Sequence, residues 1–309
     1  MNFEIKKESK DIWLIGPGYI GIEYAKVLNS LNVEYQVLGR SQKSKIKFFK
    51  ETGVKVEDND VEYFLKKNKP PKRAIITVNI EQLHKVASKL IKFGVKSLLI
   101  EKPGSLFKKD LLKLQKLSNS LNADVFIAYN RRFYDSVIAA KKIIKKDQGI
   151  SSVFFDFTEL SEKIKKTNNS NEIKQRWLIA NSSHVIDLVF FLCGVPKKMV
   201  SLFKGELTWH KSSSRFAGSG ITINNVLFSY AANWESAGRW SIEIMTKNHK
   251  LIFCPLESLK IMKRNSFDVI DIKTAKNDNH FKPGLYNLIK DFINDNNKNF
   301  CTLEQQLVN

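Results

Sequence analysis

The stretch Ile12-Trp13-Leu14-Ile15-Gly16-Pro17-Gly18-Tyr19-Ile20-Gly21 decides the fold of this chain. Its four leading apolar residues predict a buried strand, and the apolar positions that follow recur at helical spacing. Between them the glycines match G-x-G-x-x-G, the pattern of a dinucleotide-binding turn. Gly16 permits the tight turn, Gly18 lets the backbone approach a pyrophosphate, and Gly21 lets the helix pack closely on the strand. The start of the helix, with Tyr19 and Ile20, would face the negative charge.

Further short apolar strands follow in the first part of the chain. They cover residues 35–38, 74–78, 97–100 and 124–129, and a helix is expected over about 81–93, before Gly94. Continuous apolar strands that alternate with helices predict a parallel sheet covered on both faces. We therefore predict an α/β chain whose residues 1–129 form an N-terminal Rossmann domain with a doubly wound parallel sheet.

The second part of the chain has a different pattern. A helix is expected over about 135–146 and another over 183–192, and strand-like runs cover 153–157, 199–203, 219–225, 226–231, 240–245 and 251–254. Hairpin turns are expected at Asn224-Asn225 and Lys247-Asn248, and the Lys/Asn/Ser-rich residues 162–172 suggest a mobile surface loop. Residues 130–309 are thus predicted to form an α+β domain with a large, mostly antiparallel open sheet. Because its open face needs a cover, we expect a homo-oligomer through that sheet.

Composition narrows the class of protein. The net charge is +20, but only 8 of the 51 basic residues are Arg and the Lys residues are spread along the chain, so nucleic-acid binding is not expected. A basic surface favours anionic ligands. No apolar run is long enough for a membrane span, and residues 1–7 lack the apolar core of a signal peptide. Three scattered cysteines fit a reduced, cytoplasmic setting without a metal site.

The end of the second strand bears on cofactor choice. NAD-binding sites usually carry an acidic residue there for the ribose hydroxyls, whereas this chain has Gly39-Arg40-Ser41. Arg40 is suited to stack on adenine or to pair with a 2′-phosphate, and Ser41 to donate a hydrogen bond. NADP(H) is therefore favoured over NAD(H).

A second strand end carries Glu101-Lys102-Pro103, where proline halts the strand. Ligands bind at the carboxyl ends of strands in such sheets. About eighty residues later, Ser183-His184 begins a helix. Lys102 can donate a hydrogen bond to an oxygen that gains negative charge, and His184 can exchange a proton near neutral pH. Asp187, one turn further on the same face, is spaced to orient His184 or the sheet around it.

At this point the sequence resembles the glucose–fructose oxidoreductase, inositol dehydrogenase and rhizopine-catabolism (Gfo/Idh/MocA) family. The resemblance covers almost the whole chain and rests on five pieces in order. They are the glycine motif, Thr77-Val78-Asn79 followed by His84, Glu101-Lys102-Pro103, Tyr129-Asn130-Arg131-Arg132-Phe133, and Ser183-His184-Val185-Ile186-Asp187-Leu188. Members of this family oxidise or reduce a sugar or cyclitol carbon with a nicotinamide cofactor, and often form dimers or tetramers.

The resemblance implies roles for individual residues. Lys102 and His184 would be the catalytic residues, beside the nicotinamide and the reacting hydroxyl, with the substrate between the cofactor and the second domain. Cofactor contacts would come from Thr77, Val78, Asn79, Glu101, Lys102 and Asn130, together with the glycine motif (Gly16, Gly18, Tyr19, Ile20, Gly21) and Gly39, Arg40 and Ser41. Substrate contacts would come from Arg131, Trp177, Asn181 and His184, where the arginine suits an anionic group and the tryptophan a sugar face.

One position departs from the family pattern. Where an Asp commonly lies four residues before the histidine, this chain has Ala180. Three interpretations follow. The chain is an NADP(H)-dependent oxidoreductase on a sugar-type alcohol or ketone, including a nucleotide-linked or modified sugar; a non-catalytic cofactor-sensing or regulatory protein; or a glycosidase that uses bound NAD as a transient oxidant. The first is our leading hypothesis, and Ala180 favours the second.

Overall fold

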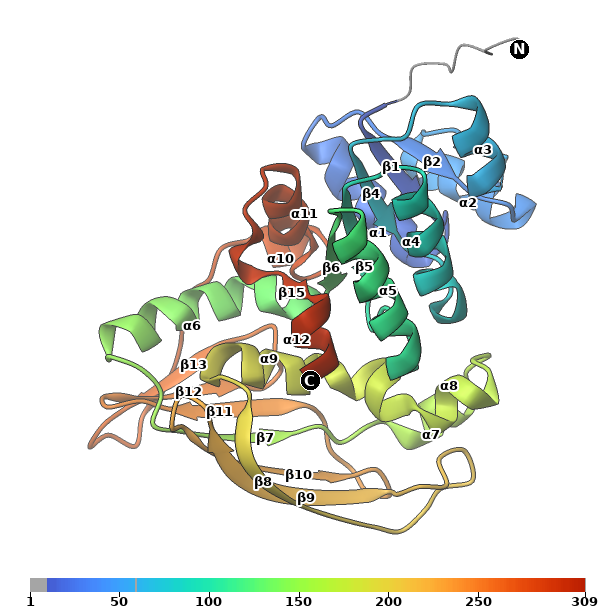
Figure 1. The fold of residues 1–309 in the computed structure, drawn as a ribbon. Helices are drawn as coiled ribbons and strands as arrows, with labels where there is room; N and C mark the ends of the chain where they lie inside the picture. Colours follow the sequence, from blue (N-terminus) through green and yellow to red (C-terminus); the bar gives the residue numbers. More distant parts are fainter. Residues whose placement is uncertain (1–9, 59, 309) are drawn as a thin grey trace. The chain divides into compact units, whose positions relative to one another are not determined.

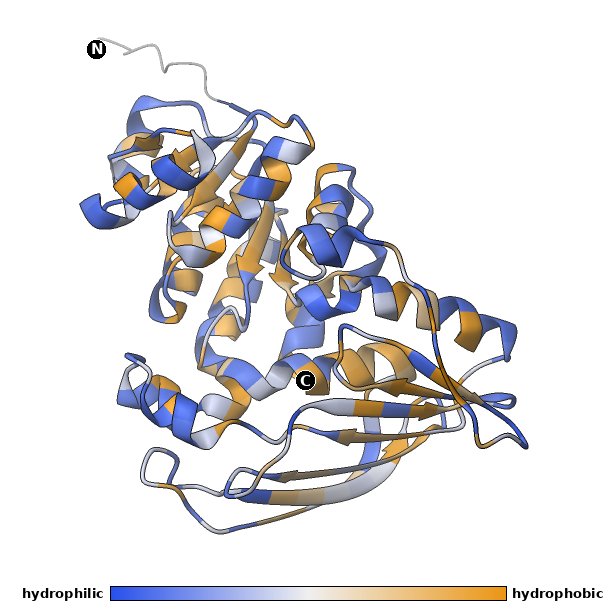
Figure 2. Ribbon diagram, turned by 180° about the vertical axis from the view of Figure 1, so that it is seen from behind, coloured by the Kyte–Doolittle hydropathy of each residue, from blue (hydrophilic) through white to orange (hydrophobic). Residues whose placement is uncertain are grey.

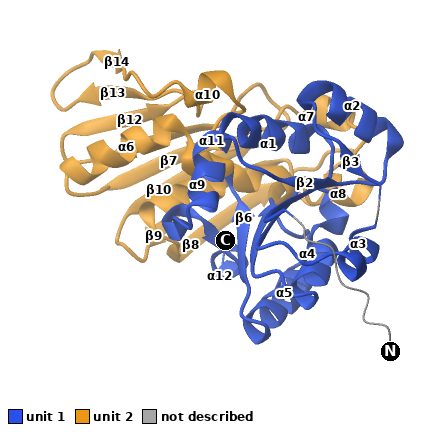
Figure 3. Ribbon diagram, turned by 90° about the horizontal axis from the view of Figure 1, so that it is seen from above, with its two compact units in different colours: residues 1–129, 285–308 blue, residues 130–284, 309 orange. Residues whose placement is uncertain are grey.

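The computed structural model describes residues 10–58 and 60–308 and divides the chain into two compact units (Figure 1). Unit 1 holds the chain up to Tyr129 together with Leu285–Val308, and unit 2 holds Asn130–Gly284 (Figure 3). The last segment differs from the sequence prediction, which placed residues 285–309 in the second domain. The sequence around residues 1–7, on which the expected lack of a signal peptide rested, lies outside the described residues.

Unit 1 is built on a seven-stranded sheet. Its strands are β1 (Ile12–Ile15), β2 (Gln36–Leu38), β3 (Val56–Glu57), β4 (Arg73–Ile76), β5 (Ser97–Glu101), β6 (Asp124–Ala128) and β15 (Cys301–Thr302). The first six are parallel in the order β3-β2-β1-β4-β5-β6, and β15 pairs antiparallel with β6. This is the doubly wound order in which ligands bind where the strand order reverses, between β1 and β4. The predicted Rossmann-type fold is thus confirmed.

Helices connect these strands. They are α1 (Tyr19–Ser30), α2 (Gln42–Thr52), α3 (Val61–Lys67), η1 (Ile80–Gln82), α4 (Leu83–Lys92), α5 (Lys108–Ser120), α11 (Leu285–Ile293), η4 (Asn297–Asn299) and α12 (Leu303–Val308). Figure 2 shows apolar residues along the central strands, and Trp13, Ile76 and Ile100 belong to one buried cluster. Burial of such side chains is the main favourable term that holds the sheet and helices together.

The C-terminal segment joins unit 1 through specific contacts. Arg73 on β4 forms an ion pair with Asp295 at 2.5 Å, and the Gln306 side-chain amide on α12 donates a hydrogen bond to the Pro103 carbonyl oxygen at 3.2 Å. Cys301 on β15 is fully buried against the same sheet. The segment therefore extends the first sheet by one edge strand, a pairing that composition alone did not reveal.

Unit 2 contains the predicted, mostly antiparallel sheet. Its strands are β7 (Ser152–Asp156), β8 (Pro196–Lys204), β9 (Arg215–Thr222), β10 (Leu227–Asn233), β11 (Ser241–Met245), β12 (His249–Phe253), β13 (Lys260–Lys263) and β14 (Val269–Asp271). They run in the order β14-β13-β12-β11-β7-β10-β9-β8, and the β7–β10 pair is parallel. Both expected hairpin turns are present, and Asn225 adopts a left-handed φ of 59° in the first.

The helical segments of unit 2 are η2 (Asn130–Phe133), α6 (Asp135–Lys146), α7 (Ser161–Lys165), α8 (Asn171–Gln175), the π-helical η3 (Leu178–Ser182), α9 (Ser183–Cys193) and α10 (Asn277–His280). Helix α9 packs on β7 and β11. The surface segment 162–172, expected to be a loop, holds parts of the two short helices α7 and α8. Each helix has one buried isoleucine, Ile164 or Ile173, and the Lys174 ammonium donates hydrogen bonds to two backbone carbonyls.

Apolar side chains are exposed on this sheet: Met199, Leu202 and Phe203 on the edge strand β8, and Leu227 on β10. Oligomerisation through this sheet stays a prediction. Within residues 10–58 and 60–308, no helix has the length and apolar character needed to cross a membrane, and no group of His, Cys, Asp and Glu is arranged to hold a metal ion.

Candidate cofactor and substrate sites

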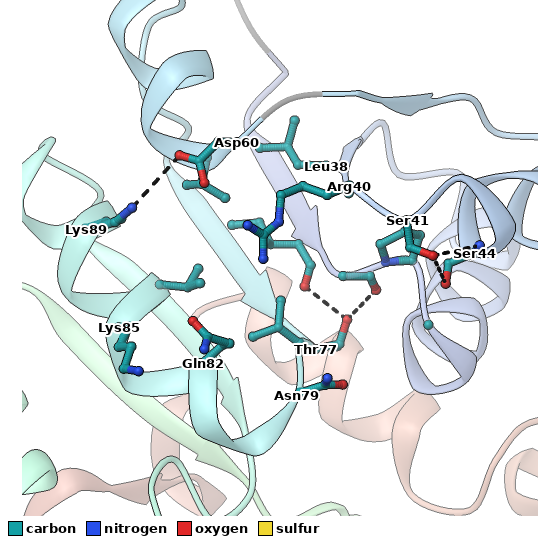
Figure 4. Close-up of a pocket in the computed structure, with 18 residues that line it drawn as sticks. Leu38, Arg40, Ser41, Ser44, Asp60, Thr77, Asn79, Gln82, Lys85 and Lys89 are labelled. Carbon is teal, nitrogen blue, oxygen red and sulfur yellow. Dashed lines mark hydrogen bonds and ion pairs between the residues drawn. The ribbon is translucent and has the colours of Figure 1, made fainter. Parts of the chain in front are cut away.

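A cavity of about 500 Å³ opens at the carboxyl ends of β1, β2 and β4 in unit 1 (Figure 4). Its position coincides with the switch point at which such sheets bind ligands. The predicted residues that line it are Gly16, Gly18, Gly39, Arg40, Ser41, Thr77, Val78 and Asn79. Tyr19 and Ile20 lie in the first turn of α1 and do not line this cavity, and Tyr19 is exposed.

The glycine turn has the geometry that its motif predicts. Gly16 has a φ of +111°, and a Cβ atom there would lie 2.8 Å from the Thr77 carbonyl carbon. A Cβ atom on Gly21 would lie 2.1 Å from the Gly16 carbonyl oxygen, so only glycine lets α1 approach the turn. Around Gly18, by contrast, no described atom lies within 4 Å of that position. The turn is closed on its protein side and open toward the cavity, which fits a bound pyrophosphate.

Thr77 ties the two strand ends together. Its hydroxyl donates to the carbonyl oxygen of Gly16 at 2.7 Å and also lies 3.2 Å from that of Ile15. The side chain is buried. Thr77 lines the cavity as predicted, but its hydroxyl is engaged with the glycine turn and holds that turn in place.

Basic and hydroxyl groups follow β2. Ser41 caps α2 and accepts a hydrogen bond from the Ser44 backbone N–H at 3.4 Å. The Arg40 guanidinium points into the cavity (Figure 4). Asp60, the one acidic residue in the described lining, caps α3 by accepting from Glu62 N–H at 2.9 Å.

Sequence reasoning missed the opposite wall of the cavity. Gln82, Lys85, Val86 and Lys89 line it from η1 and α4. Their spacing places them on one helical face, a signal that was available in the sequence. The Lys89 ammonium lies 3.2 Å from Glu62 and 3.9 Å from Asp60, which balances part of its charge.

Glu101 and Lys102 end β5 in unit 1. The Tyr24 hydroxyl donates to Glu101 Oε1 at 2.8 Å, and Tyr24 is fully buried. Burial, followed by the neighbouring Glu101 charge, raises the pKa of Tyr24 well above its usual value. The Lys102–Pro103 peptide is cis, and the Pro103 carbonyl accepts the bond from Gln306. The two neighbours of Lys102 in the chain are thus both held: Glu101 by Tyr24 and Pro103 by Gln306.

In unit 2, His184 belongs to a cluster around Trp240, a residue that sequence reasoning did not assign. The two ring centroids are 6.3 Å apart, and both side chains are buried. The Arg131 and Arg239 guanidinium carbons lie 4.8 Å and 4.4 Å from the Trp240 ring centroid. The structure therefore brings two predicted residues, Arg131 and His184, to one indole and adds a second arginine.

A buried carboxylate also lies in this region. Glu159 accepts hydrogen bonds from Ser182 Oγ at 2.7 Å and from Asn181 Nδ2 at 3.0 Å. Burial raises the pKa of Glu159 despite these bonds. Ala180 is buried on the same π-helical segment. The segment before His184 is thus anchored to a carboxylate, which comes from the loop that follows β7.

Other predicted residues have different partners. Asp187 accepts two hydrogen bonds from Arg132 at 2.6 Å and 2.8 Å in a buried ion pair, and its role in orienting His184 stays a prediction. Asn130 donates to the Pro283 carbonyl at 2.8 Å and accepts from Arg131. Trp177 packs edge-on against Trp209, with ring centroids 6.1 Å apart. Lys102 belongs to unit 1 and His184 to unit 2.

Comparison with known proteins shows similarity in structure. No family model matches the chain, and no curated protein matches its sequence. Among solved structures, UDP-N-acetylglucosamine 3-dehydrogenase GnnA from Acidithiobacillus ferrooxidans is 16% identical with a TM-score of 0.74, over 98% of this chain and 94% of that one. The dehydrogenase MviM from Clostridium difficile is 17% identical with a TM-score of 0.77, over 96% and 95%.

A third solved structure is a super-repressor mutant of Gal80p from Saccharomyces cerevisiae. It is 12% identical with a TM-score of 0.76, over 98% of this chain and 93% of that one. At sequence identities this low, the similarity shows a shared fold and not a shared function. The chain therefore shares its fold with these proteins over almost its whole length.

Proposed function

We propose that this protein is an NADP(H)-dependent oxidoreductase that acts on a sugar-type alcohol or ketone carbon. The main observation behind this proposal is the cavity at the β1–β4 switch point. Its glycine turn is open at Gly18, and the Arg40 guanidinium points into it. Both features suit a dinucleotide. The fold shared with dehydrogenases supports the proposal.

The residues of the cavity fit the 2′-phosphorylated cofactor better than the unphosphorylated one. Arg40 and Ser41 offer donors beside the end of β2, and Lys85 adds a second cation on the facing wall. Asp60 is engaged with the α3 N-terminus and Lys89. A guanidinium binds phosphate through paired hydrogen bonds, whereas NAD-type sites use a carboxylate for the ribose.

In the proposed reaction, the bound nicotinamide supplies or accepts the hydride. Lys102 donates a hydrogen bond to the substrate oxygen and stabilises its negative charge. His184 takes or returns the hydroxyl proton, since its ordinary pKa lies near neutrality. Glu101, held by Tyr24, positions the backbone of Lys102.

Glu159 has a positioning role in this proposal. By accepting from Asn181 Nδ2, it turns the amide oxygen of Asn181 away from itself and leaves that oxygen to accept from a substrate hydroxyl. It also holds Ser182, two residues before His184. Glu159 thus offsets the absence of a carboxylate at Ala180.

The test is cofactor oxidation or reduction with a panel of sugars, uronic acids and nucleotide sugars. We expect NADP(H)-dependent turnover of at least one member, and a loss of at least 100-fold in Lys102→Ala and in His184→Ala, because acid–base groups contribute about 10²–10⁴-fold. Lys92→Ala, on the exposed side of α4, is the matched control. Turnover that survives Lys102→Ala nearly unchanged would contradict the mechanism.

A second function, cofactor sensing without turnover, is favoured by Ala180 and by the shared fold of Gal80p. It predicts tight NADPH binding and no turnover on any member of the panel. The mass of a cofactor that copurifies with the protein would separate NADP(H) from NAD(H) under either function.

A further inference from the structure

Two arginines share one tryptophan in unit 2. The Arg131 and Arg239 guanidinium carbons lie 4.8 Å and 4.4 Å from the Trp240 ring centroid, and the His184 ring centroid lies 6.3 Å away. Stacking on an indole holds a guanidinium in place while its in-plane N–H groups stay available. The cluster therefore presents two positioned cations beside the residue proposed to move the proton.

The donors of this cluster outnumber its acceptors. Among the described residues, the buried Nε of Arg131 and Nε1 of Trp240 have no hydrogen-bond partner. Arg131 has a single side-chain hydrogen bond, from Nη1 to the neutral Asn130 Oδ1 at 3.3 Å. A guanidinium carries five N–H groups, and buried donors are normally satisfied.

Nearby carboxylates do not fill this gap. Glu159 and Glu257 attract Arg131, and Glu159 also attracts Arg239, but only through charge at a distance and not through a hydrogen bond. Both carboxylates accept hydrogen bonds from other groups: Glu159 from Asn181 and Ser182, and Glu257 from Tyr134 at 3.3 Å. Burying a cation without a close counter-ion is costly.

We propose that Arg131, Arg239 and Trp240 form a subsite for an anionic group of the substrate, a carboxylate or a phosphate. The substrate class is then an acidic or phosphorylated sugar. An anion with two or more acceptor oxygens can accept charge-assisted hydrogen bonds from guanidinium N–H groups of both arginines. That the bound anion is part of a substrate rests on the proposed function. The predicted binding itself does not require turnover.

Calorimetric titration of the NADPH-loaded protein tests the subsite. The probes are glucuronate, galacturonate and glucose 6-phosphate, each compared with its neutral parent, glucose or galactose. We expect at least one acidic probe to bind at least tenfold more tightly than its parent, since charge-assisted bonds are worth about a factor of ten or more. Preference for the uronates or for the phosphate identifies the anion.

Arg239→Gln is the decisive variant, because Arg239 is exposed and its replacement leaves the core intact. We expect Arg239→Gln to weaken binding of the acidic probe at least tenfold and to leave binding of the neutral parent unchanged. Arg264→Gln is the matched exposed control in unit 2. Arg131→Lys, which keeps the charge but loses the fork, should give an intermediate loss.

Two results would overturn the subsite. In the first, no acidic probe binds more tightly than its neutral parent; in the second, Arg239→Gln changes the affinity for the acidic and the neutral probe by the same factor. Its failure is distinguishable from failure of the proposed function. Tight binding of acidic probes without turnover supports the subsite and contradicts the oxidoreductase, whereas turnover of neutral sugars alone contradicts the subsite.

Discussion

Asn181 Nδ2 lies 3.0 Å from Oε1 of Glu159, so a residue just before the helix of His184 is held by a carboxylate twenty-two positions earlier in the chain. This bond fixes which way the Asn181 amide faces. Because Ser182 donates to the same oxygen at 2.7 Å, the π-helical segment has two anchors. The geometry of the segment before His184 thus depends on Glu159.

Glu159→Gln should lower kcat/KM for the substrate at least tenfold while NADPH affinity stays within about twofold. The new amide keeps one acceptor oxygen, but it replaces the other oxygen, which accepts from Asn181 Nδ2 at 3.3 Å, with a donor and removes the charge. A lost charge-assisted hydrogen bond costs about 1.5–3 kcal/mol. Steady-state kinetics and a NADPH titration measure both quantities. Glu162→Gln, at an exposed position of α7, is the control. An unchanged kcat/KM would remove the positioning role.

The pH profile gives an independent check on Glu159. Burial raises the pKa of this carboxyl above its usual value, and the ionised form accepts the bonds from Asn181 and Ser182. Activity should therefore fall as the pH drops through this raised pKa, and the fall should disappear in Glu159→Gln. A persisting acid limb in the variant would assign that limb to another group.

Arg40→Ala should weaken NADPH binding by about 10–100-fold and leave NADH binding nearly unchanged, because the lost interaction is with the 2′-phosphate. Fluorescence titration with both nucleotides measures the ratio. Lys43→Ala is a matched control, since Lys43 is exposed on α2 and does not line the cavity. Equal loss for the two nucleotides would show that Arg40 stacks on adenine and does not select the phosphate.

Gln306→Leu should destabilise the protein by about 1–3 kcal/mol, because it leaves the Pro103 carbonyl without the donor that Gln306 supplies at 3.2 Å. The thermal unfolding midpoint measures the loss, with Gln305→Leu at the exposed neighbouring position as the comparison. If the two variants unfold at the same temperature, the contact contributes nothing measurable.

Asp147→Asn should lower the free energy of unfolding at pH 7, and the difference from the natural protein should shrink between about pH 4 and pH 2. Burial opposes ionisation of Asp147, but hydrogen bonds from Thr246, His249 and Asn248 lower its pKa from 3.8 to about 2. A lowered pKa stabilises the fold above the unfolded value, and this contribution is lost as the pH falls through the folded value.

Chemical denaturation at pH 7 and at pH 3 measures that difference. Asp268→Asn, at an exposed position in the same unit, should show no such pH dependence. A constant difference between Asp147→Asn and the natural protein at both pH values would contradict the assignment.

The sequence by itself determined the parts of this protein that rest on local patterns. Strand, glycine turn and helix are contiguous over residues 12–30, so the switch-point cavity and the position of Arg40 followed from spacing and glycine sterics. The mostly antiparallel second sheet followed in the same way from alternating runs and turn residues. Composition misled at residues 162–172, which hold parts of two short helices, and at residues 285–308, which belong to unit 1.

Tertiary structure alone decided the contacts between distant segments. Glu159 anchors Asn181, Trp240 gathers Arg131, Arg239 and His184, and Gln306 returns to Pro103 across about two hundred residues. Asp187 pairs with Arg132 for the same reason. Such partners are chosen by packing and by the need to satisfy each buried polar group, which depend on the whole fold and leave no periodic signal in the chain.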